Sequence, residues 1–207
     1  MGRPHTPLLD RDRIADAALK LTDRRGDFTI LDLSRALKVT PAALYHHVDG
    51  RDGIIALMRE RMARTVDASG FGQLPWDQAL RQWAISYRDT FAAHPGTIGM
   101  LAAEPVADPA VQAQYERAVT ALQDAGFPGH TALAVITAVE SFVLGSALDL
   151  AAPPVMVADV DAAATPRLAG AVAATPSGRA RADQAFELGL DALITGLRHR
   201  LGQAGNG

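Results

Sequence analysis

The order of apolar and polar residues along this 207-residue chain follows the period of an α-helix almost everywhere. Apolar side chains recur three and four positions apart, and the strict alternation of a half-buried strand is almost absent. The pattern predicts helices over residues 10–24, 30–37, 41–48, 51–68, 75–94, 108–125, 129–151 and 179–201. We therefore expect an all-α protein.

Glycine and proline divide this pattern into two parts. Gly26 is placed to end the first helix, and the Gly- and Pro-rich connector 69–75 interrupts the helical periodicity. We place the domain boundary there, with an N-terminal domain over residues 1–68 and a C-terminal domain over residues 69–207. Residues 152–178 are rich in Ala, Pro and Val, which predicts a mobile loop with at most one short helix.

Residues 29–48 are the most informative stretch. Thr29 is a candidate N-cap for one short helix. Thr40 is a candidate N-cap for a second helix, with Pro41 at the first helical position, where its missing N–H costs nothing. Leu44 lies on the side of that helix which the pattern predicts to be buried. Two short helices joined by a tight turn are typical of a helix-turn-helix whose second helix lies in the major groove of DNA.

The other side of the second helix carries the candidate base-reading residues. Small side chains would let the backbone approach the bases, and aromatic or imidazole tips would donate hydrogen bonds to bases or phosphates. The residues concerned are Ala42, Ala43, Tyr45, His46 and His47. A different reading stays open, in which the two histidines are only solvated and the tyrosine packs on the first helix.

Further candidates would contact the DNA backbone. Thr29 and Thr40 stand at helix N-termini, where hydroxyl and N–H groups suit phosphate oxygens, although both could serve only as caps. Arg51 begins the next helix and could bind a phosphate from the other side. Arg3, in a Gly-Arg-Pro segment, could enter the minor groove as an arm or could belong to a disordered tail.

Charge is distributed unevenly along the chain. Residues 1–66 hold twelve Lys and Arg against nine acids, whereas the remainder holds eight Arg against fourteen acids, and the net charge is −3. A basic N-terminal part on an acidic body suits a polyanionic partner at one end. The chain has no Cys, which excludes disulfides and thiolate metal sites.

Other classes of protein find little support in the sequence. We see no signal peptide, and Glu140 and Asp149 interrupt the longest apolar stretch, so we expect no membrane span and a cytoplasmic protein. There is no Gly-rich phosphate loop and no His-x-x-x-His or Glu-x-x-His spacing on a helix. We therefore expect neither an enzyme nor a bound metal or cofactor.

A family resemblance adds to this reading. Residues 44–48, Leu-Tyr-His-His-Val, match the L-Y-x-H-[VF] run of TetR-family recognition helices, and residues 10–62 resemble the DNA-binding domain of those transcriptional regulators. Residues 76–96 and 121–149 are similar to the regulatory domain of the tetracycline-repressor type. The resemblance implies a homodimer that binds a palindromic operator in double-stranded DNA, with Arg51 gripping the backbone and a small-molecule pocket below each DNA-binding domain.

The C-terminal domain would hold the effector. Trp83 and Tyr87 lie one helical turn apart on the same side, so they can line a pocket or simply fill the core. By resemblance they match pocket positions of the tetracycline repressor, but Trp83 replaces the amide that grips the drug and Leu101 replaces the histidine that ligates its magnesium. We therefore predict an apolar or aromatic effector without metal. The candidate effector-binding residues are Asp67, Trp83, Tyr87, Met100, Leu101, Tyr115 and Phe142. His94 could orient the effector or cap its own helix.

Helices 129–151 and 179–201 would form the dimer core as a four-helix bundle with their partners. Small residues would permit close approach at Ala138, Ser141, Gly145 and Ala192, and an apolar seam would include Leu133, Val139, Phe142, Leu188 and Leu193. A twofold axis would set the recognition helices about 34–36 Å apart. Effector binding would favour a spacing that fits the operator poorly, with a coupling of about 1–3 kcal/mol.

The sequence thus predicts a helix-turn-helix domain followed by a helical ligand-binding and dimerisation domain, together acting as a ligand-responsive transcriptional repressor. An alternative stays open: a helical small-molecule-binding or interaction module whose DNA binding is weak or lost.

Overall fold

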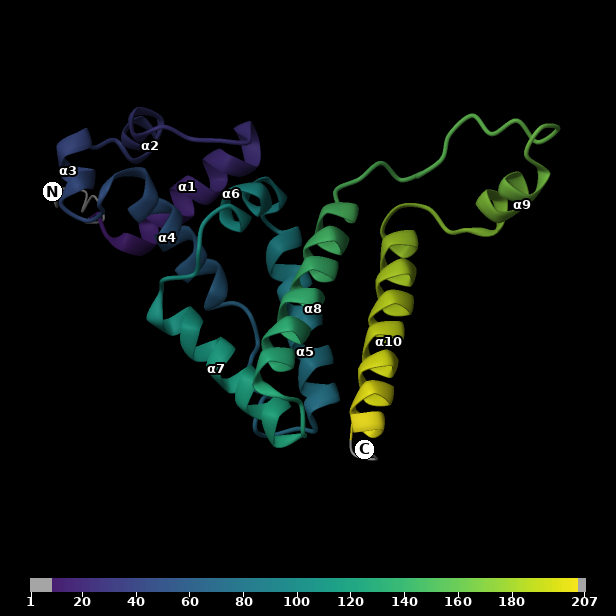
Figure 1. Cartoon of the computed structure of the whole chain (residues 1–207). Helices are drawn as coiled ribbons and strands as arrows, with labels where there is room; N and C mark the ends of the chain where they lie inside the picture. Colours follow the sequence, from purple (N-terminus) through teal and green to yellow (C-terminus); the bar gives the residue numbers. More distant parts are fainter. Residues whose placement is uncertain (1–8, 205–207) are drawn as a thin grey trace, which may run out of the picture. The chain divides into compact units, whose positions relative to one another are not determined.

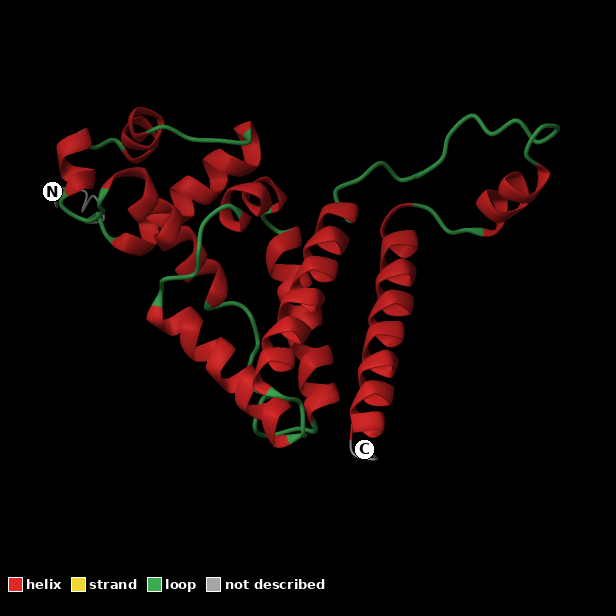
Figure 2. Ribbon diagram, viewed as in Figure 1, coloured by secondary structure: helices red, strands yellow, loops and turns green. Residues whose placement is uncertain are grey.

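The structure is a computed structural model that describes residues 9–204 (Figure 1). In chain order the helices are α1 (Arg11–Arg25), α2 (Ile30–Leu37), α3 (Pro41–Tyr45), α4 (Gly50–Ala63), α5 (Trp76–Ala92), the 3-10 turn η1 (Pro95–Thr97), α6 (Ile98–Ala102), α7 (Pro109–Asp124), α8 (Gly129–Asp149), α9 (Pro166–Ala174) and α10 (Gly178–Ala204). Figure 2 shows helices and loops and no strand among residues 9–204. The all-α prediction is confirmed.

The chain forms two compact units. The first contains residues 9–66 and 93–115, and the second contains residues 67–92 and 116–204. The change of unit at Val66 falls close to the boundary expected from the sequence, but residues 93–115 belong with the first unit although they follow α5. The physical reason is packing, because η1 lies against α1 and α6 lies against α4.

The helix bounds agree with the predicted ones to within two residues except at four places, one of which is the end of α10 at Ala204. α3 ends at Tyr45 and α4 ends at Ala63, both earlier than expected. η1 and α6 were not predicted at all, since a three-residue turn and a five-residue helix are too short to display a helical period.

The core of the first unit comes from one side of each helix. Apolar positions at helical spacing are fully buried in α1, α2, α3 and α4, namely Ile14, Ala18, Leu33, Leu44, Ile54 and Met58. Each of the Ile, Leu and Met side chains among them contributes about 1.5–3 kcal/mol of burial free energy. Gly26 adopts a left-handed conformation with φ 76° and ends α1, as its position in the sequence predicted.

The second unit is built around α5, α8 and α10, where Leu80, Ile136 and Leu190 are fully buried. Between α8 and α10 the chain reaches beyond the ends of both helices and carries α9 (Figure 1). α9 buries none of its residues and is one short helix in residues 152–178, where the sequence predicted at most one.

Candidate functional site

Capping interactions position the helix-turn-helix. The Thr29 hydroxyl accepts a hydrogen bond from the Asp32 N–H at 3.1 Å, and the Thr29 N–H donates to the Asp32 carboxylate at 3.3 Å, which completes a capping box. The hydroxyl also donates to that carboxylate at 2.7 Å. The same hydroxyl lowers the pKa of the Asp32 carboxyl. The Thr40 hydroxyl accepts from the Ala43 N–H at 3.3 Å, with Pro41 at the start of α3. Both predicted N-caps are therefore confirmed.

The turn between α2 and α3 is tight because Lys38 adopts a left-handed conformation, with φ 59° and ψ 43°. The Lys38 N–H donates to the Arg35 carbonyl at 3.3 Å and the Val39 N–H donates to the Ser34 carbonyl at 3.0 Å. These bonds satisfy carbonyls at the end of α2 and direct the chain into α3.

The two sides of α3 differ sharply in exposure. Leu44 is fully buried, and Val48, just past the helix, is 7% exposed, whereas Tyr45 is 56% exposed. The tyrosine therefore does not pack inside the first unit. The other predicted base-reading positions are at least partly accessible, since Ala42 and His46 are exposed and Ala43 and His47 are half-buried. Pro41, which we also predict to be a DNA-binding residue, is exposed. Their contacts with DNA remain predictions.

The two histidines lie in the turn that follows α3 and not within it. His46 is the C-cap residue, and the His47 N–H donates to the Leu44 carbonyl at 2.9 Å. His47 also lines an open hollow of about 410 Å³ with residues 9–12, which precede and begin α1. Arg3, the predicted minor-groove arm, lies outside the described residues.

Arg51 has an internal role that sequence analysis did not predict. Its guanidinium donates to the Phe28 carbonyl at 2.5 Å and to the Asp27 carboxylate at 2.7 Å, and it lies 4.7 Å from the centre of the Phe28 ring. These contacts lower the pKa of the Asp27 carboxyl, chiefly through the Arg51 hydrogen bond. Arg51 thus ties the start of α4 to the segment between α1 and α2, and a phosphate contact would compete with these partners.

The predicted effector-binding residues divide between the two units. Asp67, Trp83, Tyr87 and Phe142 belong to the second unit, and Met100, Leu101 and Tyr115 belong to the first. Asp67 already has partners, because its carboxylate accepts from the Ser69 hydroxyl at 2.6 Å and from the Gln82 amide at 2.6 Å. Those bonds lower the pKa of the Asp67 carboxyl, with the Ser69 hydroxyl as the largest cause.

Aromatic rings form a continuous row along α5. The Trp83 and Tyr87 rings lie 5.0 Å apart, as expected for residues one turn apart, and Tyr87 stacks on Phe91 at 4.6 Å. The Phe71 ring extends the row at 6.3 Å from Trp83. Phe71, Trp83 and Phe91 are buried, at 5%, 5% and 8% exposed, and Tyr87 is half-buried, so most of the row lies inside the second unit.

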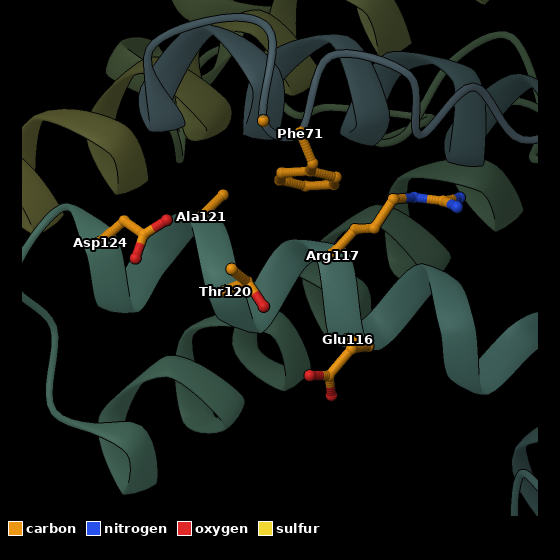
Figure 3. Close-up of a pocket in the computed structure, with 7 residues that line it drawn as sticks. Phe71, Glu116, Arg117, Thr120, Ala121 and Asp124 are labelled. Atoms are coloured by element: carbon orange, nitrogen blue, oxygen red, sulfur yellow. The ribbon is translucent and has the colours of Figure 1, made fainter.

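A small hollow lies beside this row (Figure 3). It has a volume of about 160 Å³ and is lined by Phe71, Gly72, Glu116, Arg117, Thr120, Ala121 and Asp124. In Figure 3 the Phe71 ring lies over the face of α7 that carries Arg117, Thr120 and Ala121. The hollow is smaller than the 300–1,000 Å³ common for ligand pockets, and it contains none of the predicted effector residues.

His94, which follows α5, is paired with a residue of α1 through its Nδ1. Its Nδ1 lies 2.7 Å from the Asp23 carboxylate, which belongs to the last part of α1. The two residues are 71 positions apart, so no local pattern could have paired them. The contact joins the start of the 93–115 segment to the helix-turn-helix part of the first unit.

The predicted dimer face is only partly available. Leu133 and Leu188 are 53% and 73% exposed, and an open groove of about 500 Å³ on α8 is lined by His130, Leu133, Ala134, Thr137, Ala138 and Ser141. Val139, in contrast, is 1% exposed within its own chain, so its place in the seam was predicted wrongly. Phe142 stacks on Phe186 of the same chain at 5.7 Å.

α8 is long and apolar enough to cross a membrane by length and composition alone, with a mean hydropathy of 1.8 and one third of the window buried. Core helices of soluble proteins meet the same criterion. Among residues 9–204 no group of three or more His, Asp or Glu side chains is arranged to hold a metal ion.

Comparison with known proteins connects these features. Residues 71–201 match the family described as tetracyclin repressor-like, C-terminal domain. The class D tetracycline repressor of Escherichia coli is 31% identical over 215 residues, covering 93% of this chain and 91% of the repressor. An HTH-type transcriptional regulator of Saccharopolyspora erythraea is 29% identical over 142 residues, which cover 68% of this chain and only 60% of that regulator.

Solved structures agree with the sequence matches. Apo ActR from Streptomyces coelicolor superposes with a TM-score of 0.77 at 27% identity, covering 95% of this chain and 98% of ActR. ActR in complex with actinorhodin superposes with a TM-score of 0.72 at 25% identity, with coverage of 95% and 98%. Since the family match spans more than half of the chain and the repressor match spans nearly all of it, this chain belongs to the TetR family of transcriptional regulators.

Proposed function

We propose that this protein is a DNA-binding transcriptional repressor that an apolar or aromatic small molecule releases from its operator. The observation that carries the proposal is the accessible side of α3 and the turn after it. Tyr45 is 56% exposed while Leu44 beside it is fully buried, so the helix is anchored on one side and open on the other. An anchored helix with an open polar side is what major-groove binding requires.

Two copies would present two such helices. α8 and α10 carry apolar residues that their own chain leaves accessible, of which Leu133 is 53% and Leu188 is 73% exposed. These residues favour a twofold interface made by the two helices. A transcriptional repressor of this family must reach the operator DNA in the cytoplasm, so we place the protein there. We propose a palindromic duplex as the partner, because a twofold dimer contacts two equivalent half-sites.

The effector would lie against the aromatic row of α5. The rings of Trp83 and the half-buried Tyr87 lie 5.0 Å apart, and the structure of ActR was solved with actinorhodin bound. We therefore propose an aromatic effector. A thermal-shift screen of aromatic compounds tests this, because a ligand that binds only the folded state raises Tm. A compound that raises the Tm of the wild type but not of Trp83→Ala supports the assignment, and equal shifts in both proteins contradict it.

DNA binding is tested with a duplex selected by the wild-type protein from a random-sequence pool. Binding should weaken steeply with salt because phosphate contacts release counterions. Tyr45→Ala and His47→Ala should each weaken binding by roughly tenfold, the size expected when a base or phosphate contact is lost. Gln123→Ala, an exposed neutral position on α7 of the second unit, is the matched control and should bind like the wild type.

If no duplex is selected, or if both α3-region variants bind like the Gln123→Ala control, the recognition surface is assigned wrongly. The first of these results would favour the alternative of a helical small-molecule-binding module without DNA binding.

A further inference from the structure

Arg88, on α5, is a charged side chain enclosed within the second unit. Its side chain is 5% exposed, and its guanidinium carbon lies 4.4 Å from the centre of the Phe186 ring of α10, which is 3% exposed. Its Nη1 donates to the Asp183 carboxylate of α10 at 2.6 Å. A guanidinium has five N–H donors, and arginine is seldom buried this deeply unless acceptors meet them. The other donors of Arg88 therefore call for partners.

One edge of this guanidinium is without an acceptor. Nε and Nη2 of Arg88 are both buried, and neither has a hydrogen-bond partner among residues 9–204. On the edge that these two nitrogens share, the N–H bonds are parallel, so together they match the two oxygens of a carboxylate. Buried donors of a charged group cost free energy when they stay unmet, so this edge suits an acceptor that those residues do not supply.

Arg181, on α10, shows how a carboxylate satisfies a buried guanidinium in the same unit. Its side chain is 8% exposed, and its Nη1 and Nη2 donate to the two carboxylate oxygens of Asp149 at 3.0 and 2.8 Å. Its Nε has no partner in the described part of the chain. Arg88 donates to its own carboxylate through Nη1, which leaves two adjacent donors for a second carboxylate.

The Asp183 carboxylate compensates the charge of Arg88 only in part. It also lies 3.3 Å from the Arg179 Nε, and its side chain is 42% exposed, so water screens its attraction. The same exposure places the Arg88 guanidinium one ion pair away from the surface of the second unit. Because Asp183 binds Nη1, which is not part of the free edge, the guanidinium has room for a second negative group.

Aromatic rings adjoin this guanidinium. Arg88 lies over Phe186, and Phe186 stacks on Phe142 of α8 at 5.7 Å with an interplanar angle of 8°. Phe142 is one of the predicted effector residues, and Trp83 and Tyr87 lie on the same helix as Arg88. A flat conjugated acid would pack on such rings while its carboxylate meets the guanidinium.

We infer that Arg88 binds the carboxylate of an aromatic acid through its Nε and Nη2. The inference rests on the proposed function, because it names the chemical class of the aromatic effector proposed above. It adds an anionic group to an effector that the sequence predicts to be apolar or aromatic. A lysine at this position would keep the positive charge but lose the two parallel donors, so the fork contributes to the preference beyond the charge.

The experiment compares aromatic acids with their uncharged amides. The probes are benzoate, cinnamate and naphthoate with benzamide, cinnamamide and naphthamide, and Kd is measured by calorimetric titration of the full chain. The variants are Arg88→Met, which keeps the apolar stem without the donors, and Arg88→Lys. Arg181→Met is the matched control, because it also removes a buried guanidinium from an ion pair but leaves the free edge of Arg88 in place.

In the wild type and in Arg181→Met, at least one acid should bind about tenfold or more tightly than its amide, because a charge-assisted bidentate pair is stronger than a neutral hydrogen bond. In Arg88→Met the ratio of amide Kd to acid Kd should fall to about one, and Arg88→Lys should give an intermediate ratio. An NMR readout does not depend on the folding of Arg88→Met. The Nε–H resonance of Arg88, assigned by its absence from the spectrum of Arg88→Lys, should move downfield with the acid and by less with the amide.

Equal affinity of the wild type for acids and amides would overturn the inference, because water would then satisfy the free edge and Arg88 would serve only its ion pair. An acid preference that persists unchanged in Arg88→Met and Arg88→Lys would also overturn it, since the carboxylate would bind elsewhere. In both cases aromatic compounds still bind, so the proposed effector class stands. If no acid and no amide binds the wild type, the proposed aromatic effector fails and the inference fails with it.

Discussion

Gly96 is the position at which a single added methyl group should separate the 93–115 segment from the helix-turn-helix. A Cβ at Gly96 would lie 2.7 Å from the Thr22 carbonyl oxygen and 3.2 Å from the Asp23 Cα. Both are backbone atoms at the end of α1, and the Thr22 carbonyl already accepts the Gly26 N–H at 2.7 Å. Neither neighbour can rotate away, so Gly96→Ala must displace η1 from α1.

The magnitude follows from that geometry. Carbon–carbon contacts are optimal at about 3.5–4.0 Å, so the segment must move by roughly 0.5–1 Å. Overpacking of this kind costs about 1–3 kcal/mol. Loss of unfolded-state freedom on replacing glycine offsets about 0.4–1 kcal/mol of that cost. We expect a net destabilisation of roughly 1–2 kcal/mol, which lowers Tm by about 2–8 °C in a chain of this length.

Gly99→Ala is the matched control, three residues further along in α6. A Cβ at Gly99 meets nothing within 4 Å, and its φ is not positive. Alanine there should raise stability by up to about 1 kcal/mol, because glycine inside a helix is unfavourable by that amount. The assay is thermal unfolding followed by circular dichroism for both variants under identical conditions. A Tm of Gly96→Ala equal to or above that of Gly99→Ala would refute the close packing of η1 on α1.

Three further predictions concern the caps, the carboxylates and α10. Thr29→Ala should cost about 1 kcal/mol in unfolding free energy, measured by urea titration, because it removes the capping-box acceptor; no change would mean that the cap is not formed. The same variant should raise the pKa of the Asp32 carboxyl, which the Thr29 hydroxyl lowers, and an NMR titration measures it. The pKa values of the Asp27 and Asp32 carboxyls are lowered in the folded state, so their ionised forms stabilise the fold above the unfolded value of about 3.9. This stabilisation is lost as pH falls through the folded-state pKa values. Acid unfolding of the wild type should therefore begin below about pH 4, and the unfolding free energy of Asp27→Asn should depend less on pH. Gly189→Ala should destabilise by about 1–3 kcal/mol, because its Cβ would lie 2.5 Å from the Phe142 ring, whereas Gly196→Ala in the same helix meets nothing within 4 Å and should not destabilise.

Much of the helix-turn-helix could be predicted from the sequence because it depends on residues three or four positions apart. The Thr29 and Thr40 caps each act within one turn, and Pro41 fixes its own backbone. The contact between the Trp83 and Tyr87 rings was predictable for the same reason, since α-helical geometry places positions i and i+4 side by side.

Tertiary packing alone decided the rest. Arg59 meets the Leu101 carbonyl across 42 positions and His94 meets Asp23 across 71, distances over which no periodicity relates two residues. Val139 is buried within its own chain, although the sequence pattern of α8 allowed it to face a partner instead. A helix that is apolar on most sides does not show by its pattern which side packs against its own chain. Local patterns in the sequence were therefore sufficient for the longer helices and for the Thr29 and Thr40 caps, because each depends on residues within one or two turns. Tertiary packing was needed to show that Tyr45 is exposed, that residues 93–115 belong with the helix-turn-helix part and that Arg59 joins them.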